Sequence, residues 1–243
     1  MDFELTEEQK MFQAMVRDFC AGEIAPHAAE WDETEKFPYD VVKKMADAGL
    51  HSVHFPEEYG GSGDEVTFAI ATEEISRACA GIGVVYLVSL GLGMYPVVMH
   101  GSEQLKRHYI PRVIDGAIVA FGLTEAMAGS DVAAMETKYA REGDYYVLNG
   151  QKIFISNGAE ADIVTTFATK DKSLGYRGIS AFVVDRGTKG FSVGKLERKM
   201  GLHPASVTEL IFDDCKIPVA NMLGEEGRGF RIALEGIDAS RVS

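Results

Sequence analysis

The chain changes its hydrophobic period once, close to residue 131, and this change restricts the folds that it can adopt. Before that point apolar residues recur at helical spacing, as in the series Met11, Phe12, Met15, Val16 and Phe19. After it, short apolar runs such as Ile163 to Thr169 are separated by turn residues and are typical of strands. The 243 residues are enough for two ordinary domains with separate cores. We therefore predict an α+β multidomain chain: an N-terminal all-α helical bundle over residues 1–120, a middle β-barrel domain over residues 121–232, and the start of a C-terminal helical domain over residues 233–243.

Start and stop signals place the helices of the first half. Thr6 and Gln9 form a capping-box pattern, in which the Thr6 hydroxyl accepts from a free backbone N–H and Gln9 reaches back. Pro38 lies near the first turn of a second helix, which is expected to end at Gly49. Further helices are expected over residues 65–80 and 102–114.

One uncharged run, from Ile82 to Met99, just reaches the length of a membrane span. It contains three glycines and Pro96, and no basic flank favours insertion. These features favour a helix that is buried in the protein core and broken near Pro96. We therefore expect no membrane span.

Tight turns divide the strand-rich half. Gly143-Asp144 separates two short strands, and Asn149-Gly150 is a strong hairpin signal. We expect one strand to end at Leu148 and a new one to run from Gln151 to Ser156. Several short strands at this spacing are typical of a sandwich or barrel.

Composition excludes some classes of function. Lys and Arg number 24 against 37 Asp and Glu, and the resulting net charge of −13 repels phosphate backbones, so no nucleic-acid partner is expected. Cys20, Cys79 and Cys215 form neither a CxxC pair nor a disulfide framework, and the acidic N-terminus lacks a signal-peptide pattern. These features indicate a cytoplasmic protein, with the mitochondrial matrix left open although no transit peptide is seen. The histidines show no metal-ligand spacing, so no metal site is expected.

Two short segments are candidates for chemistry. Residues Phe121 to Asp131 are poor in large apolar side chains and rich in small residues, hydroxyls and carboxylates, as in segments that contact something other than protein. In the second segment, Lys152 to Asn157, an aromatic ring at Phe154 and a hydroxyl at Ser156 lie two positions apart on an expected strand. Both would project from one face and meet one planar ligand. The alternative is an ordinary strand with a half-buried Phe154 and Ser156 at a turn.

These segments and several others, in the right order, resemble the acyl-CoA dehydrogenase family over nearly the whole chain. The matching motifs are Asp2 to Gln9, Phe55 to Gly61, Leu123 to Asp131, Asn149 to Lys152, Ile217-Pro218 and Leu223 to Phe230. The resemblance implies FAD as cofactor and oxidation of an acyl-CoA thioester to the trans-2-enoyl-CoA. It also implies an electron-transfer flavoprotein as electron acceptor and assembly as a homodimer or homotetramer.

The resemblance assigns roles to individual residues. The cofactor-binding residues would be Phe121, Leu123, Thr124, Gly129, Ser130, Phe154, Ile155 and Ser156. Among these, Phe154 would pack on the flavin and the Ser156 hydroxyl would reach its N5. The residues that contact the acyl-CoA would be Ser130, Ser173, Asp238 and Arg241.

The chain departs from the family pattern in ways that affect the chemistry. Ala126, Phe154 and Ser156 stand where the family usually has Pro, Trp and Thr. The family's catalytic Glu usually lies in a third, helical domain, and in a minority branch it precedes the Arg that matches Arg241, where this chain has Ser240. We therefore expect no catalytic base in this chain and place the base beyond Ser243.

Some assignments stay open at this point. Glu125 and Asp131 are expected to be structural, Glu125 by holding the segment in shape and Asp131 by capping backbone N–H groups. One alternative function is an oxygen-reacting acyl-CoA oxidase or flavin monooxygenase of the same fold, and another is a non-catalytic flavin- or CoA-binding module. The acyl preference depends on a pocket floor expected between Leu87 and Met99.

Overall fold

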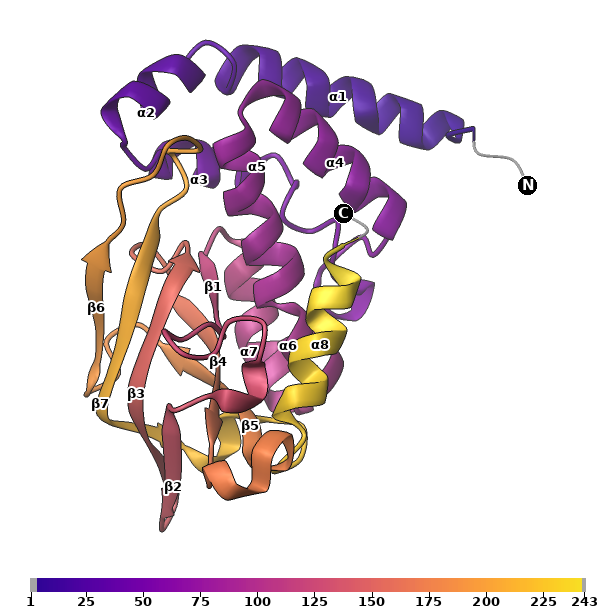
Figure 1. Ribbon diagram of the computed structural model, residues 1–243. Helices are drawn as coiled ribbons and strands as arrows, with labels where there is room; N and C mark the ends of the chain where they lie inside the picture. Colours follow the sequence, from indigo (N-terminus) through magenta and orange to yellow (C-terminus); the bar gives the residue numbers. More distant parts are fainter. Residues whose placement is uncertain (1–3, 242–243) are drawn as a thin grey trace.

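The computed structural model describes residues 4–241, in which a helical layer packs against one side of a strand layer (Figure 1). The helices of the first half are α1 (Glu7–Glu23), α2 (Ala28–Thr34), α3 (Tyr39–Asp47), α4 (Glu65–Ala78), α5 (Ala80–Leu87), α6 (Tyr95–His100) and α7 (Glu103–Ile114). The strands are β1 (Val119–Gly122), β2 (Lys138–Glu142), β3 (Tyr145–Ser156), β4 (Ile163–Thr169), β5 (Ile179–Asp185), β6 (Phe191–Leu196), β7 (Val207–Pro218) and β8 (Met222–Leu223). Short helical turns are η1 (Glu57–Tyr59), η2 (Val88–Gly93), η3 (Val132–Ala134), η4 (Lys172–Gly178) and η5 (Val219–Asn221). A last helix, α8 (Gly229–Ala239), returns to the helical layer and packs against α6 and β5.

Local side-chain caps begin three of the helices. The Thr6 hydroxyl accepts from the Gln9 N–H at 3.2 Å, and the Gln9 side chain accepts from the Thr6 N–H at 3.0 Å, so the predicted capping box is confirmed. The side chains of Asp64 and Ser102 accept from the first turns of α4 and α7 in the same way. Each cap satisfies a backbone donor that the helix itself leaves free.

The long apolar run forms the centre of the helical layer. Residues Ala80–His100 are long and apolar enough to cross a membrane, but 61% of their most apolar stretch is buried inside the fold. The predicted buried core helix is confirmed. Its irregularity starts before Pro96, because Val88–Gly93 forms a π-helical turn. That turn lies directly against β1, and a Cβ on Gly93 would lie 2.7 Å from Val119.

Eight strands form one mixed sheet that curls around its own core. The strand order is β6–β7–β3–β2–β4–β5–β8, and β1 runs parallel to β4. Strands from both ends of this order contribute to one apolar cluster, for example Phe212 of β7 and Phe182 of β5. The predicted fold class, helices followed by a curled strand domain, is confirmed, whereas the division at residues 120 and 232 stays a prediction.

The central strands β4 and β5 are buried on both faces. Val164 and Phe182 point into the strand core, while Ile163 and Phe167 belong to the core of the helical layer. Strands covered on both sides read as continuous apolar runs, which explains why Ile163 to Thr169 shows no alternation. The two cores are therefore joined through β4 and β5.

The predicted hairpin at Asn149-Gly150 is wrong. Strand β3 runs unbroken from Tyr145 to Ser156 and pairs with β7, with a β-bulge at this point. The Asn149 side chain bonds to Asp214 of β7, donating to its carboxylate at 3.1 Å and accepting from its N–H at 2.8 Å. Gly150 has φ +149°, and a Cβ there would lie 2.6 Å from the Thr137 Cα. The glycine is thus needed for a close approach to the neighbouring chain and not for a turn.

We expect the Gly150→Ala variant to lose about 2 kcal/mol of unfolding free energy, because both its φ and the contact with Thr137 exclude a Cβ. The matched control is Gly22→Ala in α1, where a Cβ meets nothing within 4 Å. That change should be neutral or stabilise by at most about 1 kcal/mol. Urea denaturation followed by circular dichroism measures both, and equal midpoints for Gly150→Ala and wild type would contradict the account.

Candidate functional site

A buried ion pair fixes the segment Phe121 to Asp131 to strand β3. The Lys152 Nζ lies 2.6 Å from the Glu125 carboxylate and also donates to the Leu123 carbonyl at 3.3 Å. The two charged side chains are 0% and 5% exposed. The Ile153 N–H donates to the Thr124 carbonyl at 2.9 Å, so the backbone of the segment is also tied to β3. A lysine ammonium that is removed from water is costly unless ion-pair and hydrogen-bond partners of this kind replace its hydration.

The Glu125 carboxylate holds a second part of the chain. It accepts from the N–H groups of Glu136 and Thr137, just before β2. The backbones of Glu125 and Ala128 bond to each other in both directions at 3.1 Å. Burial raises the pKa of the Glu125 carboxyl, but the Lys152 ammonium and the other donors bring it below its usual range. Burial lowers the pKa of Lys152 to about 8, although Glu125 opposes this. Glu125 therefore holds the segment in shape, as expected.

Most of the rest of the segment is open, although Ala128 is buried. Ala126, Gly129 and Ser130 are exposed, Met127 is 75% exposed, and a Cβ on Gly129 would meet nothing within 4 Å. The capping role expected of Asp131 is wrong, because its carboxylate makes no capping hydrogen bond where the turn Val132–Ala134 begins. The segment thus presents small residues and hydroxyls on a fixed base.

At the end of β3, a second bulge turns the ring of Phe154 outward. The register with β7 shifts between Lys152 and Ile155, and Phe154 has φ +58°. This left-handed conformation is unfavourable for an aromatic residue and is found mostly where a site requires it. Phe154 is 61% exposed, while Lys152 and Ile155 in the same strand are buried. The alternative of an ordinary strand with a half-buried Phe154 is therefore wrong.

The other expected cofactor residues differ in how far their side chains are buried. Phe121 and Leu123 are 8% and 6% exposed, and the Phe121 ring packs edge-on against Phe167 at 5.0 Å. Ile155 is 2% exposed and points into the strand core. These three residues offer mainly backbone groups to a ligand. Thr124 and Ser156 are half-buried, so their hydroxyls stay at the surface of the fold.

The expected acyl-CoA residues lie in two places. Asp238 and Arg241 are exposed at the end of α8. Ser173 is exposed in the turn η4, which an ion pair of 2.6 Å between Lys172 and Glu136 holds close to the end of the open segment. Ser130 and Ser173 therefore lie in neighbouring parts of the surface.

A cavity of about 280 Å³ lies between α4, η2, α6 and α8. Its lining includes Gly91, Tyr95 and Met99, which belong to the expected pocket floor, and Ser240 at the end of α8. His54 and Glu65 also line it and were missed by the sequence reasoning. The burial of Lys152 was not predicted either, because a lysine that follows Gln151 in a strand carries no local signal of burial.

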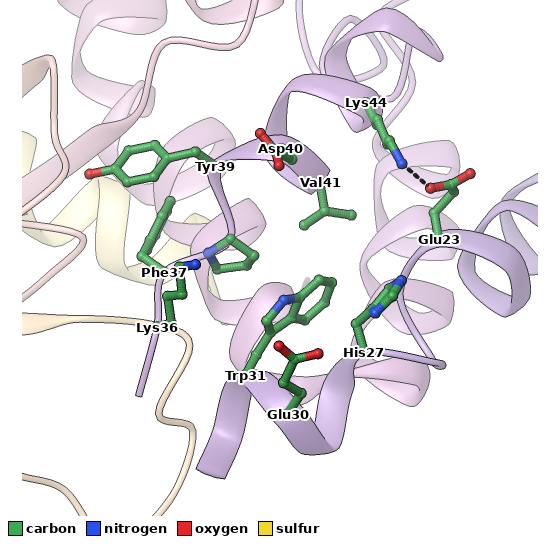
Figure 2. Close-up of a pocket in the computed structure, with 11 residues that line it drawn as sticks. Glu23, His27, Glu30, Trp31, Lys36, Phe37, Tyr39, Asp40, Val41 and Lys44 are labelled. Carbon is green, nitrogen blue, oxygen red and sulfur yellow. Dashed lines mark hydrogen bonds and ion pairs between the residues drawn. The ribbon is translucent and has the colours of Figure 1, made fainter. Parts of the chain in front are cut away.

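A second pocket, of about 410 Å³, opens between α1, α2 and α3 (Figure 2). Trp31, Phe37 and Pro38 form its walls, and the ion pair of Lys44 with Glu23 lies at its rim. All of its lining residues fall between positions 23 and 44, so it holds none of the residues expected to bind cofactor or substrate.

Comparison with known sequences gives one consistent family. Residues 6–117 match the acyl-CoA dehydrogenase N-terminal domain, and residues 120–215 match the acyl-CoA dehydrogenase middle domain. The short-chain specific acyl-CoA dehydrogenase of Clostridium acetobutylicum is 46% identical over 100% of the chain and 64% of its own length. An acyl-CoA dehydrogenase of Bacillus subtilis is 45% identical over 98% of the chain and 63% of its own length. The chain thus spans a little under two thirds of these relatives.

Solved structures agree with this comparison. The butyryl-CoA dehydrogenase of Megasphaera elsdenii superimposes with a TM-score of 0.96 at 39% identity, over 100% of the chain and 65% of that structure. A chain in a structure of the electron transferring flavoprotein of Acidaminococcus fermentans superimposes with a TM-score of 0.97 at 43% identity. The match covers 100% of the chain studied and 64% of that chain. An acyl-CoA dehydrogenase from Bacillus anthracis, complexed with FAD, superimposes with a TM-score of 0.91 at 34% identity. The match covers 98% of the chain studied and 41% of that structure.

The ion pair predicts a stability change with a defined pH dependence. In Glu125→Gln the Lys152 ammonium loses its counter-charge, and we expect a loss of about 3 kcal/mol of unfolding free energy at pH 7. The pKa of Lys152 is about 8 in the folded protein, whereas its ordinary value is 10.5. Between these two pH values the unfolded chain binds more protons than the folded chain. The free energy of unfolding that depends on this lysine therefore rises with pH. Urea denaturation of the variant at pH 7 and pH 9.5 should therefore show partial recovery at the higher pH.

Two controls isolate the ion pair. The double variant Glu125→Gln/Lys152→Met should show no recovery with pH, because the buried amine is gone. Asp47→Asn, which breaks the exposed ion pair with Lys43, should cost less than about 1 kcal/mol. A Glu125→Gln variant as stable as wild type at pH 7 would be incompatible with the pair as the anchor of the segment.

Proposed function

The chain belongs to the acyl-CoA dehydrogenase family, and from this premise we propose that it serves the FAD-dependent oxidation of an acyl-CoA thioester to the trans-2-enoyl-CoA. The observation that carries the proposal is the exposed ring of Phe154 beside the open segment Phe121 to Asp131, with both tied to the Lys152–Glu125 pair. The named activities of the relatives support it.

The residues present fit a flavin. Phe154 presents an aromatic face outward through a strained backbone conformation, and small residues beside it leave room for a planar group. We propose that Thr124, Ser130 and Ser156 supply hydroxyl contacts to FAD. The backbone groups of Phe121, Leu123, Gly129 and Ile155 would complete the site. These donors are uncharged, as suits a ring whose own charge changes during the reaction.

FAD, when bound, supplies the acceptor for the hydride that leaves the acyl β carbon. The residues of this chain would position the ring and stabilise the charge that develops on it. Phe154 would pack against the ring, and the Ser156 hydroxyl and segment N–H groups would donate hydrogen bonds to it. Because the segment is already fixed by Lys152 and Glu125, its donors need little reorganisation as the charge appears.

The proton on the acyl α carbon needs a base from elsewhere. The Ser240 hydroxyl donates to the Ile237 carbonyl at 2.8 Å and is too weak a base at neutral pH. The proposal therefore assigns this step to a carboxylate outside these 243 residues. Asp238, Arg241 and Ser173 would contact the CoA part of the substrate.

Electrons would pass to an electron-transfer flavoprotein, and the protein would act as a homodimer or homotetramer. Similarity to a chain in the Acidaminococcus fermentans structure supports the first of these statements. An oxidase would instead pass electrons to oxygen, and peroxide formed steadily in air without another acceptor would favour that alternative. Binding of flavin without its reduction by any acyl-CoA would favour a non-catalytic module.

The direct test is anaerobic titration of the purified full-length flavoprotein with a panel of saturated acyl-CoAs. We expect at least one of them to bleach the visible absorbance of the flavin, as hydride transfer requires. A protein that binds no FAD, or whose flavin no acyl-CoA reduces, would contradict the proposal.

We expect Ser156→Ala to slow flavin reduction about ten-fold or more, because one donor to the developing charge is lost. The dissociation constant for acyl-CoA should stay within about two-fold, since this hydroxyl acts on the cofactor. Stopped-flow reduction measures both, and Ser192→Ala on the exposed strand β6 is the control. An unchanged rate in Ser156→Ala would remove the assigned role.

A further inference from the structure

The cavity between α4, η2, α6 and α8 has one polar corner in a mostly apolar lining. His54, Glu65 and Tyr95 form that corner. The remaining lining residues are Ser240 and six that are apolar or glycine, namely Phe68, Gly91, Val98, Met99, Gly236 and Ala239. Such a lining suits a ligand that is mostly hydrocarbon and carries a polar group at one point.

Two polar groups in the corner lack partners. The His54 Nδ1 is buried and makes no hydrogen bond within residues 4–241. Its closest charged neighbour is the Glu65 carboxylate at 3.6 Å, which is beyond hydrogen-bond reach. The Tyr95 hydroxyl also makes no hydrogen bond to the part of the chain that the structure describes. A buried polar atom without a partner is rare and costs stability, so the His54 Nδ1 points to a ligand group. Tyr95 is half-buried, and its hydroxyl is a second group in the lining that is free to bond to such a ligand.

Ring packing at His54 and two glycines keep the cavity open. The His54 ring lies 4.2 Å from the Phe68 ring, centroid to centroid, so its position is set by packing. A Cβ on Gly91 would reach 3.5 Å from Phe68, and one on Gly236 would reach 3.4 Å from Tyr95. Glycine at both places leaves the space beside His54 and Tyr95 unfilled.

The charges around the corner decide which polar group it accepts. Burial lowers the pKa of His54, which keeps the imidazole neutral at pH 7. Burial and the carboxylates of Glu235, Glu65 and Asp238 raise the pKa of Tyr95, which shows that the surroundings are negative. An anionic group would be repelled there, whereas an uncharged hydroxyl can both donate and accept.

We propose that this cavity takes the acyl chain and that His54 and Tyr95 make it selective for chains that end in an uncharged hydroxyl group. The proposal rests on the proposed function, since it assumes an acyl-CoA substrate. It assigns His54 and Tyr95 as specificity-determining residues, which hydrogen-bond the far end of the chain and take no part in the oxidation.

Equilibrium binding of enoyl-CoA products tests the proposal, because products bind without turnover. Isothermal titration calorimetry would compare methyl-terminated and ω-hydroxylated 2-enoyl-CoAs of four, five and six carbons, with the purified full-length protein. At the length that fits best, wild type should bind the hydroxylated chain about five-fold tighter, as one or two added hydrogen bonds allow. In His54→Leu and Tyr95→Phe this preference should fall below two-fold, while the methyl-terminated chain keeps its affinity.

His27→Leu, in the separate pocket between α1 and α3, is the matched control and should keep the full preference. Tyr95→Phe removes a single hydroxyl and decides the matter alone if His54→Leu does not fold. Equal or tighter binding of the methyl-terminated chain at every length would overturn the proposal, as would a preference that survives both variants. Failure of the proposed function is a different result, in which no saturated acyl-CoA reduces the flavin at all.

Discussion

The contact between the Lys152 ammonium and the Glu125 carboxylate determines the shape of the candidate site. Moving two charges out of water is costly, and here the cost is offset by their mutual attraction and by backbone partners on both sides. The carbonyl of Leu123 takes one ammonium proton, and the N–H groups before β2 occupy the carboxylate. Three separate stretches of chain, at residues 123–125, 136–137 and 152, are thereby held as one unit. The exposed groups on that unit are positioned before any ligand arrives, as preorganised binding requires.

The site also depends on how the two layers share strands. Because β4 and β5 are buried on both faces, the helical layer and the curled sheet cannot shift independently without opening a core. Strand β1 lies between the π-helical turn η2 and β4, and the open segment leaves its end. The cavity that η2 helps to line and the flavin segment are therefore positioned from the same strand. This arrangement connects the proposed acyl cavity with the proposed cofactor surface through packed structure.

Local signals in the sequence were sufficient for much of the fold. The capping box at Thr6 lies where its pattern predicted it, and α7 (Glu103–Ile114) occupies the range expected for a helix at 102–114. Features set by distant partners could not be predicted in this way. Asn149-Gly150 has the composition of a hairpin turn, but Asp214 and Thr137 determine its conformation.

The candidate site shows the same division between local and long-range causes. The open composition of the segment after Phe121 was visible in the sequence, and so was an aromatic residue followed by a hydroxyl. Phe154 points outward because of a β-bulge against β7, and a bulge cannot be predicted from the alternation of side chains along a strand. A lysine at position 152 reads as a solvent-exposed strand residue, and only the fold shows that it is buried against Glu125. The unpartnered Nδ1 of His54 likewise follows from packing on Phe68 and has no signature in the sequence.

The central claim is that the open segment and the end of β3 form one flavin surface. Hydrogen–deuterium exchange, followed by mass spectrometry on the full-length protein with FAD and after its removal, tests this most directly. We expect FAD to slow exchange in residues 124–130 and 153–156 together, and to leave residues 23–44 around the pocket of Figure 2 unchanged. Protection in only one of the two segments, or protection confined to residues 23–44, would contradict the account.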